Sequence, residues 1–130
     1  MLMRKVILML ALGLTCSSAL AEWTEVGNSE SFTAYVNLSS IRNVGNKVKM
    51  WTLYDYKTVQ YMGEVKYLSN TAQEEYDCIE ETHRNIAINQ YTSNMGKGDV
   101  VFTGDIKGEP SPIPPDTVIE LLWKVACDKH

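Results

Sequence analysis

The stretch from Lys47 to Tyr56 constrains the fold of this chain more than any other feature of its sequence. It reads KVKMWTLYDY, and the turn-like Val44-Gly45-Asn46 precedes it. Its β-branched and aromatic residues predict a β-strand, in which side chains alternate between two faces. One face would carry Val48, Met50, Thr52, Tyr54 and Tyr56, and the other Lys47, Lys49, Trp51, Leu53 and Asp55. Apolar groups on both faces indicate an interior strand of a sheet, covered on one side and partly on the other.

The first residues of the chain predict export. Arg4 and Lys5 form a short positive start, residues 6–14 are an apolar run, and Ala19-Leu20-Ala21 is a small-x-small cleavage site before Glu22. This is the pattern of a secretory signal peptide that is cleaved between Ala21 and Glu22. The apolar run is shorter than the about 20 residues that span a bilayer. We therefore expect residues 1–21 to be a signal peptide and residues 22–130 to form the domain.

Cys16 raises the alternative of an outer-membrane lipoprotein. A lipid-attachment site usually has Leu three positions before the cysteine and a small residue immediately before it. Here those two positions hold Gly13 and Thr15. The sequence therefore favours a periplasmic or secreted product over a lipid-anchored one.

Charge limits the class of partner. The chain has 12 Lys and Arg against 16 Asp and Glu, a net charge of −4, and loss of Arg4 and Lys5 with the signal makes it −6. The 109 residues left when 21 are removed from 130 have the length of one domain. An acidic domain without a dense basic run disfavours nucleic acid and anionic lipid as main partners.

Cys78 and Cys127 are the cysteines that remain of three after cleavage. Two cysteines in an exported chain predict one disulfide. This bond would close a loop of about 50 residues and stabilise the fold by about 4 kcal/mol in the chain-entropy model. The pair lacks the C-x-x-C spacing of a redox motif, and the two histidines are too few to complete a metal site.

The remaining elements follow from local pattern. Thr117 and Glu120 fit a capping box, which predicts a helix from there to about Cys127, tied by that cysteine to the strand at Cys78. The glycine-rich residues 94–98 lack the context of a phosphate loop and predict a hairpin connection. Residues 69–73 are polar and predict a loop. Further strands are predicted at 22–27, 32–37, 64–68, 74–79, 82–92 and 99–103.

No catalytic group, metal site or cofactor site emerges from the sequence. His130 is the last residue, and His83, beside Glu80 and Glu81, is predicted to be a solvated strand residue rather than a general base. Glu74 and Glu75 would point to opposite faces of a strand. The seven tyrosines either line a binding surface or finish the edges of the sheet. A non-catalytic binding domain is therefore expected, with a small periplasmic enzyme or inhibitor as the alternative.

Five segments carry a resemblance to a known family. They are residues 50–57, 75–78, 94–98, 113–115 and 122–127. In order and spacing they resemble the surface-adhesin protein E family of proteobacteria, over nearly the whole mature chain. The resemblance implies an α+β fold: an antiparallel sheet of about six strands, with one C-terminal helix packed on it and joined to it by the disulfide.

The same resemblance implies partners. It points to host extracellular matrix and plasma proteins such as laminin, vitronectin and plasminogen, to heme, and to a homodimer. An envelope partner in the periplasm would suit a chain without a lipid anchor. Because one helix covers only one face of a sheet, we expect the contacts on the face or edge away from it.

Overall fold

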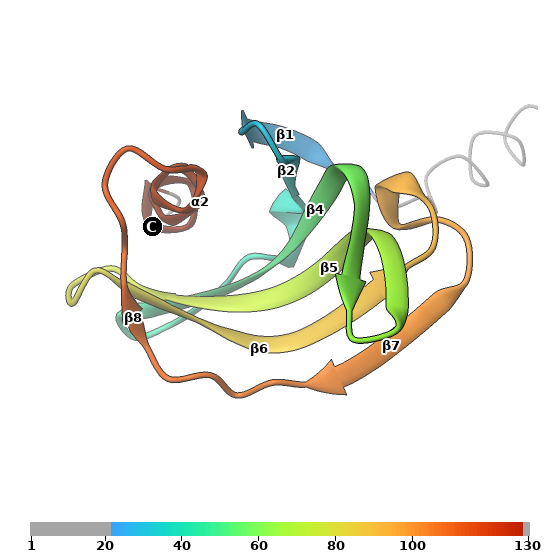
Figure 1. The fold of residues 1–130 in the computed structure, drawn as a ribbon. Helices are drawn as coiled ribbons and strands as arrows, with labels where there is room; N and C mark the ends of the chain where they lie inside the picture. The colour runs from blue at the N-terminus through green and yellow to red at the C-terminus, as the bar shows by residue number, and fades with distance from the viewer. Residues whose placement is uncertain (1–21, 129–130) are drawn as a thin grey trace, which may run out of the picture.

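The computed structural model describes residues 22–128, which form one curved antiparallel sheet with a helix lying over one of its faces (Figure 1). The strands are β1 (Thr24–Asn28), β2 (Phe32–Val36), β3 (Arg42–Val44), β4 (Lys47–Met62), β5 (Val65–Asp77), β6 (Thr82–Tyr91), β7 (Val100–Asp105) and β8 (Ser111–Pro112). The helix is α2 (Val118–Asp128), and two 3-10 turns are η1 (Leu38–Ser40) and η2 (Asn94–Gly96).

The sheet has eight strands, so the expectation of about six was wrong, and the fold is mostly β rather than α+β. The main path is β1-β2-β4-β5-β6-β7. The two extra strands, β3 and β8, are short. Each pairs with a longer strand along the edge that a main-path strand also uses. Along β4, β3 pairs with residues 47–49 and β2 with residues 52–56. Along β6, β8 pairs with Thr82 and His83, and β7 pairs with the later residues 87–91.

The predicted loop at residues 69–73 is instead the middle of β5. This segment is hydrogen-bonded in register to β4 on one side and to β6 on the other. Its polar side chains find partners: the Ser69 hydroxyl donates to the Ser93 carbonyl at 2.6 Å, and Thr71 and Tyr91 share a hydrogen bond of 3.3 Å. Polar composition therefore does not break a strand that is paired on both edges. The strand ends at Asp77, which leaves Cys78 in the following turn.

The strand from Lys47 to Tyr56 is an interior strand, as predicted. Val48 and Met50 are fully buried on the helix side. Leu53 is fully buried on the other face, where η2 lies over the sheet. The side chain of Asp55 holds η2 in place, because it accepts hydrogen bonds from the Met95 amide at 2.8 Å and from Asn94 Nδ2 at 2.9 Å. The glycine-rich connection between β6 and β7 thus covers part of the sheet.

A long extended connection brings the chain from β7 to α2. It runs along the sheet, adds β8 to β6 and then turns up to the helix (Figure 1). The predicted cap is present: Thr117 Oγ1 accepts from the Glu120 amide at 3.3 Å and donates to the Pro114 carbonyl at 2.8 Å. The helix buries Leu122 and Ala126 against the core, whose other fully buried members include Ala34, Val36 and Tyr76.

Candidate functional site

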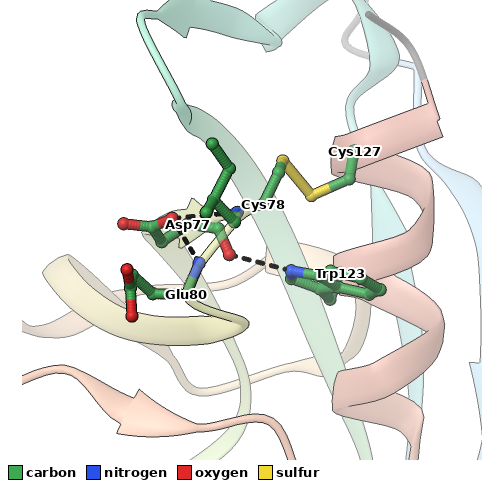
Figure 2. Close-up of a disulfide and its surroundings, with 6 residues drawn as sticks. Asp77, Cys78, Glu80, Trp123 and Cys127 are labelled. Carbon is green, nitrogen blue, oxygen red and sulfur yellow. Dashed lines mark hydrogen bonds between the residues drawn. A yellow bond between two sulfur atoms is a disulfide. The ribbon is translucent and has the colours of Figure 1, made fainter.

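The C-terminal end of α2 is fixed to the sheet by a covalent bond and a hydrogen bond (Figure 2). Cys78 and Cys127 form the predicted disulfide, with their Cα atoms 5.7 Å apart. One turn earlier on the helix, Trp123 Nε1 donates to the Asp77 carbonyl at 3.1 Å. The Asp77 carboxylate accepts from the amides of Ile79 and Glu80, which shapes the turn that carries Cys78. This arrangement holds the helix against the sheet. Both sulfur atoms are bonded to each other, so the pair has a structural role.

A buried carboxyl group lies on the helix side of the sheet. Glu74 on β5 is 1% exposed, and its two oxygens accept hydrogen bonds from the hydroxyls of Tyr54, at 2.5 Å, and Tyr76, at 3.2 Å. Burial raises the pKa of Glu74 to about 7, although the hydrogen bonds from the two tyrosines lower it. Burial, followed by the nearby carboxylate, raises the pKa of both tyrosines well above the ordinary value. Both hydroxyls therefore remain protonated donors.

A cavity of about 260 Å³ lies against this cluster, between α2 and the sheet. Its aromatic wall comes from three strands: Phe32 on β2, Tyr54 and Tyr56 on β4, and Tyr67 on β5. The rings of Phe32 and Tyr54 meet edge to face at 5.2 Å, and those of Tyr56 and Tyr67 at 5.7 Å. Burial raises the pKa of Tyr56 to about 12. Polar groups of the lining are Glu74, Asn70, His83 and Asn85.

His83 is half-buried, so the expectation of a solvated residue was wrong. Its ring stacks on that of Tyr76, with the centroids 6.3 Å apart. Its Nδ1 atom is buried and has no hydrogen-bond partner among the described residues. Burial lowers the pKa of the imidazole. The strand register places His83 directly opposite Tyr76, and this tertiary pairing brings it to the cavity.

Glu75 points away from Glu74, as strand alternation predicts. It lies on the opposite face of the sheet, where Arg84 Nε donates to it at 2.9 Å and Lys47 Nζ lies 4.0 Å away. The two adjacent carboxylates therefore do not form an acid–base pair. Within residues 22–128, no group of three or more His, Cys, Asp or Glu side chains is placed to hold a metal ion.

Two larger grooves flank α2 where it passes β1. Their volumes are about 590 and 480 Å³, and the exposed Leu121 borders both of them. Their charged groups are Glu25, Asp116, Glu120, Lys124 and Asp128. None of these carboxyl groups is buried as Glu74 is, so the two grooves are lined like ordinary protein surface. The smaller cavity differs from them because a buried carboxyl group lines it.

The hairpin between β4 and β5 extends past its neighbours as a two-stranded ribbon, residues 58–68. The pairing of β2 with β4 ends at Tyr56, and that of β5 with β6 begins at Ser69, so in the described chain neither neighbour reaches the ribbon. Three of its apolar side chains are exposed: Tyr61 by 63%, Val59 by 44% and Met62 by 39%. Lys66 Nζ lies 5.9 Å from the centroid of the Tyr61 ring. Exposed apolar groups thus gather at this end of the sheet.

The sequence-predicted sites stand apart from this cavity and ribbon. Cys78 and Cys127 lie at the far end of the helix interface. Glu22 is exposed at the start of the described chain, while Ala21, Cys16 and His130 lie outside the described residues. Sequence reasoning missed Glu74 as a site residue. The signal that could have found it is strand alternation, which places Glu74 on the same face as Tyr76. A carboxyl group on an inward strand face is a buried charge, and buried charges need polar partners.

Comparison with known proteins identifies the family. The model of the surface-adhesin protein E family matches residues 23–128. The chain belongs to this family. No curated protein matches the sequence. The resemblance seen in five sequence segments is thereby confirmed across almost the entire described chain.

Solved members of the adhesin family share the fold. A structure of Haemophilus influenzae protein E in crystal form II has a TM-score of 0.62 at 12% identity, covering 86% of this chain and 98% of the other. Protein E from non-typeable Haemophilus influenzae has a TM-score of 0.61 at 14% identity, covering 85% of this chain and 79% of the other. At identities this low, the TM-scores show a common fold and nothing more. Across residues 22–128, no helix combines the length and hydropathy of a membrane span.

Proposed function

We propose that this chain is an exported, non-catalytic binding domain of the adhesin type, whose partner is a protein of the host matrix or of the cell envelope. Membership of the surface-adhesin protein E family supports protein binding in general. The signal-like start of the sequence supports export, with cleavage between Ala21 and Glu22. The product is soluble in the periplasm or outside the cell.

The observation that carries this proposal is the β4–β5 ribbon. A two-stranded ribbon is only marginally stable in water when it stands alone, and exposed apolar side chains on it bring no benefit to folding. Tyr and Met are enriched in protein interfaces. Tyr61 and Met62 are adjacent in β4 and point to opposite faces of the ribbon, so with Val59 they offer exposed apolar groups to a partner on both faces. The ribbon extends from the sheet, so a partner reaches it without displacing α2 or the core.

Replacing the three exposed ribbon residues tests the binding surface. The variant Val59→Ser, Tyr61→Ser, Met62→Ser should bind immobilised laminin, vitronectin or plasminogen about tenfold more weakly than the native protein, because interface aromatic groups carry much of the binding energy. Surface plasmon resonance measures this, and light scattering on the same samples measures self-association. The family resemblance also implies heme as a ligand, and a heme titration followed by absorbance measures its binding.

The matched control is Val100→Ser with Val101→Ser on β7, where both valines are exposed and lie outside the ribbon. This variant should bind as the native protein does. An equal loss in both variants would contradict a specific ribbon surface. Absence of binding to the matrix proteins, heme, periplasmic extract and the chain itself would remove the support for a binding domain and favour the enzyme or inhibitor alternative.

The N-terminus of the exported protein tests the compartment. Mass spectrometry of the protein recovered from the periplasm and medium should show a chain that begins at Glu22 without lipid, because Ala19-Leu20-Ala21 supplies the cleavage motif and Cys16 lacks the attachment context. A chain that begins at a lipid-modified Cys16 would overturn both the cleavage site and the soluble product.

A further inference from the structure

We propose that the cavity between α2 and the sheet is a binding site for a small organic cation, an amine or a quaternary ammonium compound, held by Glu74 and the rings of Phe32, Tyr54, Tyr56 and Tyr67. Tyr67 lies at the base of the ribbon, but the site uses none of the exposed ribbon residues Val59, Tyr61 and Met62 and does not depend on the function proposed for them. The chemistry of the lining, the size of the cavity and the charge of Glu74 support this assignment.

The lining selects for positive charge. Four aromatic rings border the space, and the faces of such rings attract cations at distances up to about 6 Å from the centroid. Glu74 is the acidic group, and among the described lining residues none is Lys or Arg. An anion would meet this carboxyl group without a compensating cation. A purely apolar ligand would cover the Glu74 carboxylate without compensating its charge.

The aromatic wall is held in place before any ligand arrives. Phe32 contacts both Tyr54 and Tyr56, with centroid distances of 5.2 and 5.9 Å, and Tyr56 contacts Tyr67. Tyr54 is further fixed by its hydrogen bond to Glu74. Rings already restrained in this way lose little conformational entropy when a ligand binds. Asn85 at the lining is exposed, so solvent and ligand have access to the cavity.

The volume limits the ligand. The cavity holds about 260 Å³, below the range of drug-sized pockets, which begins at about 300 Å³. At roughly 30 Å³ for each water in the liquid, the space corresponds to about nine water molecules. A trimethylammonium head with a short chain fits this limit, and a large planar cofactor does not.

The charge of Glu74 makes binding depend on pH. The groups that face it are Tyr54 and Tyr56 from β4, Tyr67 and Tyr76 from β5 and His83 from β6, while β2 and α2 bring the uncharged Phe32 and Ile119. The pKa of Glu74 is about 7, so the carboxylate that a cation requires forms above that pH. Protonation of His83 at lower pH would place a positive charge at the cavity and weaken cation binding further. Affinity should therefore rise with pH.

Titration with choline tests the site. The probes are choline and tetramethylammonium, with 3,3-dimethylbutanol, an uncharged molecule of the same shape as choline, as the matched ligand control. NMR shifts of the tyrosine ring protons report binding in the cavity. We expect the two cations to bind and the alcohol to bind at least about tenfold more weakly, with choline about tenfold weaker at about pH 5.5 than at about pH 8.

Two variants assign the binding to the cavity. Glu74→Gln keeps the shape of the side chain and removes its charge, and one of its two acceptor oxygens becomes an NH2 donor. Tyr67→Leu removes one ring of the wall. Each should weaken choline binding by about tenfold or more, and Glu74→Gln should also flatten the pH dependence. Circular dichroism establishes that each variant is folded. Tyr61→Leu on the ribbon is the control, and it should leave choline binding unchanged.

The outcomes separate this site from the ribbon. Equal binding of choline and 3,3-dimethylbutanol, or no shift with either cation at millimolar concentration, would overturn the cation site while leaving the ribbon proposal intact. Loss of choline binding in the Tyr61→Leu variant would also contradict it. Loss of matrix-protein binding in the ribbon variant, with choline binding retained, would support both assignments as independent.

Discussion

Replacing Cys78 and Cys127 together by alanine should lower the free energy of unfolding by about 4 kcal/mol. The two residues are 49 positions apart, so the bond removes a large amount of conformational freedom from the unfolded chain. For a domain of this length, about 4 kcal/mol corresponds to a fall in the melting temperature of roughly 15–30 °C. Thermal unfolding followed by circular dichroism measures it, and choline and matrix-protein binding should survive below the new transition.

Trp123→Phe is the matched control for the disulfide variant. It keeps the disulfide and most of the ring packing but removes the hydrogen bond from Trp123 Nε1 to the Asp77 carbonyl. Its cost should be about 1–3 kcal/mol, since the carbonyl loses a partner while the helix stays covalently attached. Titratable thiols in the folded, exported protein would contradict the bond itself. A melting temperature unchanged by the double alanine variant would contradict its role in stability.

Stability should decrease by about 3 kcal/mol between about pH 4 and about pH 8 because of Glu74 alone. Burial raises the pKa of this carboxyl group from 4.5 to about 7 in the folded state. The folded protein therefore binds the proton more tightly than the unfolded chain. This contribution is fully present below the unfolded pKa and is lost as the pH rises through the folded one. Urea unfolding at a series of pH values measures the slope.

Glu74→Gln isolates this effect, because an amide does not titrate. The difference in unfolding free energy between the native protein and the variant should change by about 3 kcal/mol across that pH range, in favour of the variant at high pH. His83 acts in the opposite direction, since burial lowers its pKa and protonation therefore favours the unfolded state. Both proteins contain His83, so its contribution cancels. A constant difference across the pH range would show that the Glu74 carboxyl has an ordinary pKa in the folded state.

Local pattern was sufficient for features whose cause lies within a few residues. The strand at 47–56, the cap at Thr117 and the hairpin connection at 94–98 were predicted from alternation, capping and glycine content, and all three are present. The Cys78–Cys127 bond followed from the number of cysteines outside the predicted signal peptide. Family membership followed from the order and spacing of five segments distributed between residues 50 and 127, and the family model matches residues 23–128.

Local pattern failed where pairing partners decide the outcome. Residues 69–73 have the composition of a loop, yet β4 and β6 supply hydrogen bonds on both sides and make them strand. The short strands β3 and β8 pair with the parts of β4 and β6 that β2 and β7 leave unpaired, which no local signal reveals.

The sequence by itself determined the disulfide, the family and the position of the helix, because each depends on residue identity at short range or on a simple count. Only the tertiary structure decided that Glu74 meets Tyr54 and Tyr76, that four rings from three strands border one cavity, and that Tyr61 is exposed on a ribbon. Tyr54 and Glu74 are 20 residues apart and meet only through the register of β4 and β5. A shift of one residue in that register would move each side chain to the opposite face, so the site is a property of the pairing and not of the local sequence.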